Sequence, residues 1–370
     1  YSLLRFTAME AIGSTLLRIL EFILSLGVLI FLHELGHYLT SKLFKIQVEE
    51  FGFGFPPRMV KLFKIGETDF TLNWIPFGAF VRPKGENDPN VPGGLASASP
   101  LKRLFVLLGG PLMNILTAVI LFAVIYSRVG VPDLTKVLVA AVTADTPAQT
   151  AGFQTGDIFL SADGKQITAA ADLQSAVQAK LDQQITFVVQ RGDQQVTLNA
   201  VPRSNHPTDQ GPLGVTLDVP YKSGTIAETT SLGFRMAWYQ TKELFSLPVR
   251  LIQGKVSSDQ ARFVGPKGMY DIYTQARETD QENAGSKTPV ATVNTLWLLA
   301  NISVALGATN LLPFPALDGG RIIFVLPELL FKKRIPAKYE NMVHMVGFVL
   351  LLILMVVVTA QDIINPIVLP

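Results

Sequence analysis

Long apolar runs constrain the fold of this chain more than any other feature of its sequence. Residues 104–127 include no charged residue, and residues 342–360 contain only His344 as an ionisable group. About 20 apolar residues in a helix cross the hydrocarbon core of a bilayer. The composition agrees, since 49% of the 370 residues are hydrophobic and only 16% are charged. The sequence therefore predicts an integral membrane protein, with the lipid bilayer as one partner.

Two further segments indicate spans although they are less uniform. Residues 289–320 are largely uncharged and end in LDGG, whereas residues 16–44 hold several ionisable groups in a leucine-rich run. Ionisable groups are costly within a span, and they normally face an internal polar cavity and mark function. We therefore expect four transmembrane helices with a functional site on the first. Arg18 and Glu21, three residues apart, are expected to pair with one another.

Lys and Arg residues in the short loops predict the orientation. Eight lie between residues 43 and 104, five lie between residues 321 and 338, and none follows residue 360. Cytoplasmic loops carry an excess of these residues, so both loops are expected in the cytoplasm and both termini outside it. The net charge of +2 indicates no nucleic-acid partner.

The segment between the second and third spans has a different pattern. Residues 134–222 alternate apolar and polar positions in short runs separated by glycines, which predicts a small β-rich domain. Residues 223–288 include an amphipathic helical part that suits a membrane surface or packing on the spans. The loop of residues 46–102 is rich in glycine and aromatics, and it predicts β structure that re-enters the membrane.

The first span contains the sequence HELGH at residues 33–37. Positions i and i+4 lie on one face of a helix, so His33 and His37 can bind one metal ion. Glu34 then lies beside them and can take a proton from the attacking water. The chain has no cysteine, so any metal site must use histidine and carboxylate ligands.

A catalytic zinc site needs a third protein ligand from elsewhere in the chain. His206 falls in a loop of the β-rich domain, and His344 belongs to the last span. Asp318 ends the third span at the depth expected for the two histidines. The prolines and glycines of NLLPFPALDGG break the helix there, so we expect Asp318 to be the third ligand.

Three sequence elements together resemble the site-2 protease family of intramembrane zinc metalloproteases. They are HELGH in the first span, GGPLMN (residues 109–114) in the second and NLLPFPALDGG (residues 310–320) in the third. The order of spans with inserted PDZ material is similar to the bacterial branch that includes the regulator of sigma-E proteases. This chain has room for one PDZ domain only.

The resemblance implies a zinc cofactor and a set of site residues. These are the zinc ligands His33, His37 and Asp318, the general base Glu34, and the substrate-binding residues Asn310 and Asn114. It also implies that the loop GPLGV (residues 211–215) captures a peptide C-terminus. The implied substrates are single-span membrane proteins, such as an anti-sigma factor or a signal-peptide remnant. The implied location is a bacterial inner membrane, with the active site toward the cytoplasmic side.

The expected fold is a polytopic α-helical membrane protein with four transmembrane helices, a membrane-reentrant β region and an inserted extracytoplasmic PDZ (α+β) domain. Its segments in order are the N-terminal segment with the first span (1–45), the reentrant loop (46–102), the second span (103–128), the PDZ domain (134–222), the amphipathic linker (223–288), the third span (289–320), a cytoplasmic loop (321–338) and the fourth span (339–362).

Three other functions fit parts of this pattern. A catalytically inert membrane PDZ adaptor or chaperone would explain the spans and the domain, but the intact Glu34 argues against it. A zinc transporter needs polar residues along a continuous path, whereas the ligands expected here cluster at one depth. A protease with a soluble catalytic domain would need its third ligand in soluble sequence, and LDGG at the end of a span argues against that.

Overall fold

The computed structural model describes all residues except 1, 208–209, 257–261, 286–291 and 368–370. The chain divides into two compact units. The first, here called the helical unit, comprises Tyr1–Arg128 and Thr229–Pro370, and the second, the inserted unit, comprises Val129–Glu228. Each unit is built around its own contacts.

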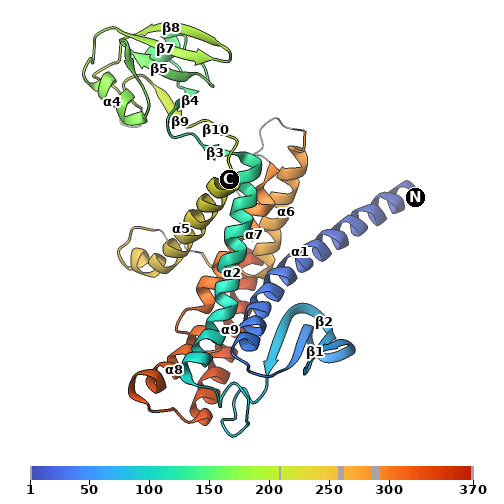
Figure 1. Ribbon diagram of the computed structural model, residues 1–370. Coiled ribbons are helices and arrows are strands. Elements are labelled where there is room, and N and C mark those ends of the chain that lie inside the picture. Colours follow the sequence, from blue (N-terminus) through green and yellow to red (C-terminus); the bar gives the residue numbers. More distant parts are fainter. Residues whose placement is uncertain (1, 208–209, 257–261, 286–291, 368–370) are drawn as a thin grey trace. The chain divides into compact units, whose positions relative to one another are not determined.

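The helical unit contains the long helices of the chain, shown in Figure 1. They are α1 (Ser2–Leu43), α2 (Pro100–Val129), α5 (Ile226–Ile252), α6 (Pro266–Glu282), α7 (Asn294–Asn310), α8 (Asp318–Phe331) and α9 (Ala337–Ile364). Among the described residues, three helical segments are long and apolar enough to cross a membrane, namely Gly13–Leu43, Pro100–Val129 and Ala337–Ile364.

The expected third span differs from the other three. Helix α7 has 17 residues, which makes it about 26 Å long, at the lower limit for crossing a bilayer. It ends at Asn310 because Pro313 and Pro315 follow within five residues and cannot continue the hydrogen-bond ladder. The structure thus supports three spans by length and composition, and the fourth span and the orientation remain predictions.

Helix α6 packs against α1, α7 and α9 (Figure 1). Arg18 of α1 pairs with Glu278 of α6, and Glu21 lies 3.5 Å from the guanidinium of Arg277. The predicted pairing of Arg18 with Glu21 is therefore wrong, because α6 lies alongside α1 and presents both opposite charges.

Both ends of α6 are tied to neighbouring helices by buried or half-buried carboxylates. Asp362 of α9 is fully buried and accepts hydrogen bonds from the backbone N–H groups of Gly265 and Gly268, at 2.8 Å and 3.0 Å. Asp280, near the other end of α6, accepts hydrogen bonds from the first N–H groups of α7, those of Asn294 and Thr295. These donors have no partner within their own helices. The glycine-proline element that precedes α6 is thus an attachment point to the last helix.

The predicted reentrant loop contains a long antiparallel hairpin of β1 (Val48–Ile65) and β2 (Thr68–Pro83). The hairpin curls, so that Phe51 of β1 pairs with both Phe70 and Val81 of β2. Its apolar face packs on α1, where the rings of Phe31 and Phe53 stack with centroids 5.5 Å apart. Aromatic contacts of this kind fix the hairpin against the helix that carries HELGH.

The inserted unit is an antiparallel sheet with two short helices. The sheet has the order β8-β7-β5-β4-β9, with β6 on β5, and a separate pair joins β3 to β10. The elements are β3 (Val131–Pro132), β4 (Val137–Val142), α3 (Pro147–Ala151), β5 (Ile158–Ala162), β6 (Lys165–Gln166), α4 (Ala170–Gln178), β7 (Ile185–Arg191), β8 (Gln194–Ala200), β9 (Val215–Asp218) and β10 (Tyr221–Lys222). Phe153, Phe159 and Phe187 form the centre of its core.

Candidate metal centre

Two helices bring three potential ligands together. His33 and His37 lie one turn apart on α1, and Asp318 is the first residue of α8. The two histidine Nε2 atoms are 3.2 Å apart, and Oδ2 of Asp318 lies 3.2 Å from His33 Nε2 and 3.3 Å from His37 Nε2. His33 is buried and the other two are half-buried. Residues 281 positions apart in sequence therefore form one group that could hold a metal ion.

The geometry of this group fits zinc. A tetrahedral ion with bonds of about 2.0 Å separates its ligand atoms by about 3.3 Å, which matches the three distances above. Beyond the two imidazoles, Oδ2 of Asp318 is buried without a hydrogen-bond partner among the described residues, as expected for an atom that binds a cation. A Cβ atom on Gly110 would lie 2.3 Å from His37 Nε2, so this glycine keeps the space beside the ligands open.

Helix α2 orients both histidine rings. Nδ1 of His37 donates a hydrogen bond of 2.8 Å to the carbonyl of Val106, which leaves Nε2 free to bind a metal. The amide of Asn114 lies 3.2 Å from Nδ1 of His33, and its own Oδ1 is buried without a partner among the described residues. Turned toward the ring, Oδ1 would accept the Nδ1 proton and leave Nε2 free on His33 as well.

The position of Asn114 differs from the substrate contact expected of it. Its side chain is fully buried behind His33, and its backbone carbonyl accepts a hydrogen bond from Ser303 of α7. It therefore orients a ligand from within the helix bundle rather than lining the cavity. The close helix crossing explains this placement, because a Cβ atom on Gly36 would lie 2.2 Å from the carbonyl oxygen of Gly109.

Glu34 is held by the hairpin. Its Oε2 accepts a hydrogen bond of 3.0 Å from the backbone N–H of Val81 on β2. The carboxylate faces the same cavity as the three ligands. A base beside a metal site in this way can accept a proton from a water molecule that attacks a substrate.

A cavity of about 260 Å³ opens onto the ligands. It is lined by His33, Glu34, His37, Phe80, Val81, Pro83, Glu86, Leu95, Val106, Leu107, Asn310, Ala316, Asp318 and Arg321. Asn310 therefore borders the cavity, and its Nδ2 donates to the carbonyl of Leu306 one turn earlier. The two other histidines lie elsewhere. His206 is in the inserted unit, whereas Nδ1 of His344 accepts the N–H of Ala316.

Sequence reasoning missed several residues of this cavity. Val81 holds Glu34 through its backbone, which no side-chain motif could reveal. Arg321 and Glu86 form an ion pair between α8 and the loop after β2. The position of Arg321 directly after LDGG was the available signal, but its partner is 235 residues away.

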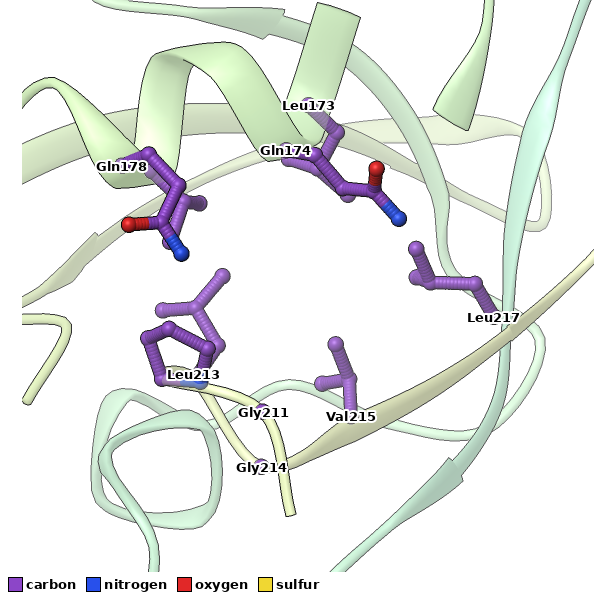
Figure 2. Close-up of a pocket in the computed structure, with 10 residues that line it drawn as sticks. Leu173, Gln174, Gln178, Gly211, Leu213, Gly214, Val215 and Leu217 are labelled. Atoms are coloured by element: carbon purple, nitrogen blue, oxygen red, sulfur yellow. The ribbon is translucent and has the colours of Figure 1, made fainter. Parts of the chain in front are cut away.

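The inserted unit has a hollow of its own, shown in Figure 2. It measures about 320 Å³ and lies between helix α4 and the segment that leads into β9. The ten residues that line it are uncharged: Leu173, Gln174, Val177, Gln178, Gly211, Pro212, Leu213, Gly214, Val215 and Leu217. The expected carboxylate-binding loop, residues 211–215, thus borders an apolar hollow (Figure 2).

Comparisons with known proteins show the family of the chain. The chain matches Peptidase family M50 over residues 21–354. A Clostridium perfringens protein named as a candidate zinc metalloprotease is 34% identical over 349 residues, which cover 93% of this chain and 98% of the relative. The zinc metalloprotease RasP of Oceanobacillus iheyensis is 28% identical over 437 residues, which cover 93% of this chain and 98% of the relative.

A solved structure is similar to part of the chain. The PDZ domain of the SdrC-like protein from Listeria monocytogenes is 20% identical and covers 22% of this chain and 85% of that domain, with a TM-score of 0.20. The PDZ interpretation of the inserted unit depends on the loop of residues 211–215 and on the hollow beside α4.

The family match and the relatives confirm the resemblance that the three sequence motifs carry. Together with the three apolar helices they indicate an integral membrane protein. The chain belongs to peptidase family M50, the site-2 protease family of zinc metalloproteases, and its cofactor is zinc.

Proposed function

We propose that this metalloprotease hydrolyses a peptide bond within or near the transmembrane segment of single-span membrane proteins. One observation carries the proposal. His33, Glu34 and His37 lie inside the helical segment Gly13–Leu43, which is long and apolar enough to cross a membrane. Ionisable residues within a span mark a functional site, and a site at that depth would be open to a substrate that is itself in the bilayer.

The residues of the chain divide the chemistry among them. His33, His37 and Asp318 would hold zinc, which acts as a Lewis acid on water and on the peptide carbonyl. Glu34, held by the N–H of Val81, accepts the proton of the attacking water and then delivers it to the leaving nitrogen. Val106 and Asn114 keep both imidazoles oriented throughout.

A substrate helix must unwind before it can be cut, because its carbonyls are hydrogen-bonded within the helix. The hairpin offers replacement partners. The N–H of Val81 points at Glu34 and therefore away from β1, and the alternation of a strand directs the N–H of Ala79 to the same side. This edge of β2 would pair with the unwound segment as an added strand.

Asn310 would contact the substrate at the cavity wall. The loop of residues 211–215 would capture a peptide C-terminus, and the four-span topology would place both termini and the inserted unit outside the cytoplasm. The setting would be a bacterial inner membrane, with the active site toward the cytoplasmic side. Anti-sigma factors and signal-peptide remnants are the proposed substrate classes.

The test compares the wild type with Glu34→Gln on a single-span reporter in liposomes, with zinc content measured on both proteins. We expect the wild type to cut within the span and Glu34→Gln to retain zinc while its cleavage rate falls by about 10²- to 10⁴-fold. The matched control is Glu340→Gln at the start of α9, which should cut normally. Cleavage by Glu34→Gln at the wild-type rate would contradict the proposed role of Glu34. Zinc binding by both proteins without cleavage of any reporter would instead favour the adaptor function.

A further inference from the structure

The loop that carries Asp318 contains an unfavourable backbone conformation. Residues 311–317 join α7 to α8, and Ala316, two residues before Asp318, has a φ of +73°. Residues with a Cβ atom avoid this left-handed region for steric reasons, whereas glycine enters it freely. The conformation of Ala316 sets the direction in which the chain enters α8. Something outside the loop must therefore favour it.

Helix α9 supplies that contact. Nδ1 of His344 accepts a hydrogen bond of 2.8 Å from the backbone N–H of Ala316. Since a backbone amide only donates, Nδ1 carries no proton and the proton of the neutral ring is on Nε2. The ring also packs against Phe324 of α8, with centroids 5.7 Å apart. His344 thus contacts both the loop and the helix that follows it.

A second contact on the same face of α9 fixes the distance between this helix and the loop. Gly347 is buried three residues after His344, and residues at this spacing share a helix face. A Cβ atom on Gly347 would lie 2.2 Å from Cβ of Pro315. The backbone of α9 therefore touches the loop one residue before Ala316. His344 and Gly347 therefore both contact the loop, at Ala316 and at Pro315.

We propose that His344 is a positioning residue for Asp318. By accepting the N–H of Ala316, His344 holds the left-handed turn that places the Asp318 carboxylate against His33 and His37. His344 is not a ligand, since the group that could hold a metal consists of the other three residues. The inference rests on the proposed role of Asp318 as a zinc ligand, and it gives the last helix a part in building the site.

Two substitutions of His344 separate the hydrogen bond from the packing of the ring. His344→Phe keeps the ring against Phe324 but has no acceptor. His344→Asn loses the ring, but its Oδ1 can occupy the position of Nδ1 and accept the N–H of Ala316. A residue that only packs would tolerate phenylalanine better than asparagine, whereas a residue that positions the turn would show the opposite order.

A third substitution tests the backbone directly. Ala316→Gly removes the steric cost of the left-handed conformation, so the loop depends less on His344. In the His344→Phe background, Ala316→Gly should therefore restore part of the zinc affinity that His344→Phe removes. In the wild-type background the same substitution should change zinc affinity less. The difference between its effects in the two backgrounds measures the coupling between His344 and Ala316.

The experiment measures zinc affinity by chelator competition on the full-length protein in detergent. We expect His344→Phe to weaken zinc binding by about 10- to 100-fold, as is typical for residues that orient metal ligands. His344→Asn should remain nearer to the wild type, and Ala316→Gly should recover affinity in the His344→Phe background. In the zinc-free protein, amide hydrogen exchange in residues 311–317 should rise for His344→Phe and not for His344→Asn.

Each part of the experiment can overturn the inference. Wild-type zinc affinity or wild-type exchange in His344→Phe would do so, as would equal losses in His344→Phe and His344→Asn. Asp318→Asn serves as the reference for the site itself. If Asp318→Asn binds zinc as the wild type does, the proposed ligand set is wrong and the inference falls with it. If Asp318→Asn loses zinc while His344→Phe does not, the positioning inference alone fails.

Discussion

The metal centre and the hollow of the inserted unit are similar in size and opposite in construction. The cavity at the metal centre measures about 260 Å³ and contains two histidines, three carboxylates and an arginine, whereas the hollow beside α4 measures about 320 Å³ and is lined by uncharged residues. The first is assembled from several helices and a hairpin, the second from two short segments. Chemistry requires polar atoms held within a few tenths of an ångström, whereas peptide recognition requires an apolar surface and backbone donors.

The largest expected effect concerns the space that Gly110 leaves beside the metal ligands. Gly110→Ala should reduce zinc affinity more than the roughly 10- to 100-fold expected for residues that orient ligands, because its Cβ atom would lie 2.3 Å from His37 Nε2. Zinc content of the purified protein measures this. Gly27→Ala on α1, where the added Cβ would meet open space, is the control. Full zinc occupancy in Gly110→Ala would mean that the ion lies elsewhere.

A core substitution in the inserted unit tests whether the two regions depend on one another. Phe187 is fully buried, and Phe187→Ala should destabilise the unit by about 3–5 kcal/mol. Limited proteolysis of the intact chain should then cut within residues 129–228, with zinc content unchanged. The exposed Val201→Ala should behave as the wild type. Loss of zinc in Phe187→Ala would show that the metal centre needs a folded inserted unit.

The proposed strand addition at the edge of β2 would give the metal centre, like the inserted unit, a part in backbone recognition. Ala79→Pro removes an N–H on the side of β2 that faces Glu34. One lost hydrogen bond to an added strand should slow cleavage of a membrane reporter by about 2- to 10-fold. Zinc content should not change. An unaltered cleavage rate would contradict strand addition at this edge.

An added negative charge should weaken peptide binding more when it lies at the uncharged hollow than when it lies on an exposed strand of the same unit. Gln178→Glu places a carboxylate at the hollow (Figure 2), where it should repel a peptide C-terminus by about 1 kcal/mol, or roughly fivefold in affinity. Titration of a fluorescent peptide with a free C-terminus measures the effect, and an amidated peptide should be insensitive. Gln195→Glu on β8 is the matched control. Equal effects on both peptides would argue against carboxylate capture.

The smallest expected effect concerns the start of α4, which borders the hollow. Hydrogen bonds from the N–H and hydroxyl of Thr168 hold the pKa of Asp172 below its usual value of 3.8. A lowered pKa in the folded state contributes stability above the usual pKa and loses it as pH falls through the folded value. The inserted unit should therefore become slightly less stable below about pH 4.

Thermal unfolding monitored across this pH range measures the effect, and Asp172→Asn should lack it. The exposed Asp193→Asn is the control, because its side chain caps no helix. If stability falls by the same amount below about pH 4 in Asp172→Asn and in the wild type, the acid sensitivity comes from another carboxylate.

Several features of the molecule could be read from the sequence because they depend on short-range pattern. HELGH places His33 and His37 on one helix face by spacing alone, and the apolar runs around them have the length of a span. Asp318 was predicted as the third ligand because LDGG ends an apolar run. The largely uncharged run of residues 289–320 predicted a third span, and α7 covers only 17 residues of it. Hydropathy does not reveal where a helix stops.

Other features depend on contacts between distant residues. Asn114 was expected to contact substrate, but the close approach of α1 and α2 buries it behind His33. Arg18 and Glu21 were expected to pair because they are neighbours on a helix surface, yet α6 offers each of them an opposite charge. No spacing rule along one helix predicts which other helix will lie beside it.

The sequence alone indicated the membrane setting and the protease family, and it predicted the candidate metal ligands, because apolar runs and short motifs are local properties of a chain. The tertiary structure decided how Glu34 and the candidate ligand Asp318 are held. Val81 reaches Glu34 through a backbone N–H, and His344 reaches the left-handed turn before Asp318 from the last helix. Both contacts use backbone groups, whose positions follow from packing and are independent of side-chain identity. For that reason they appear only in the folded chain.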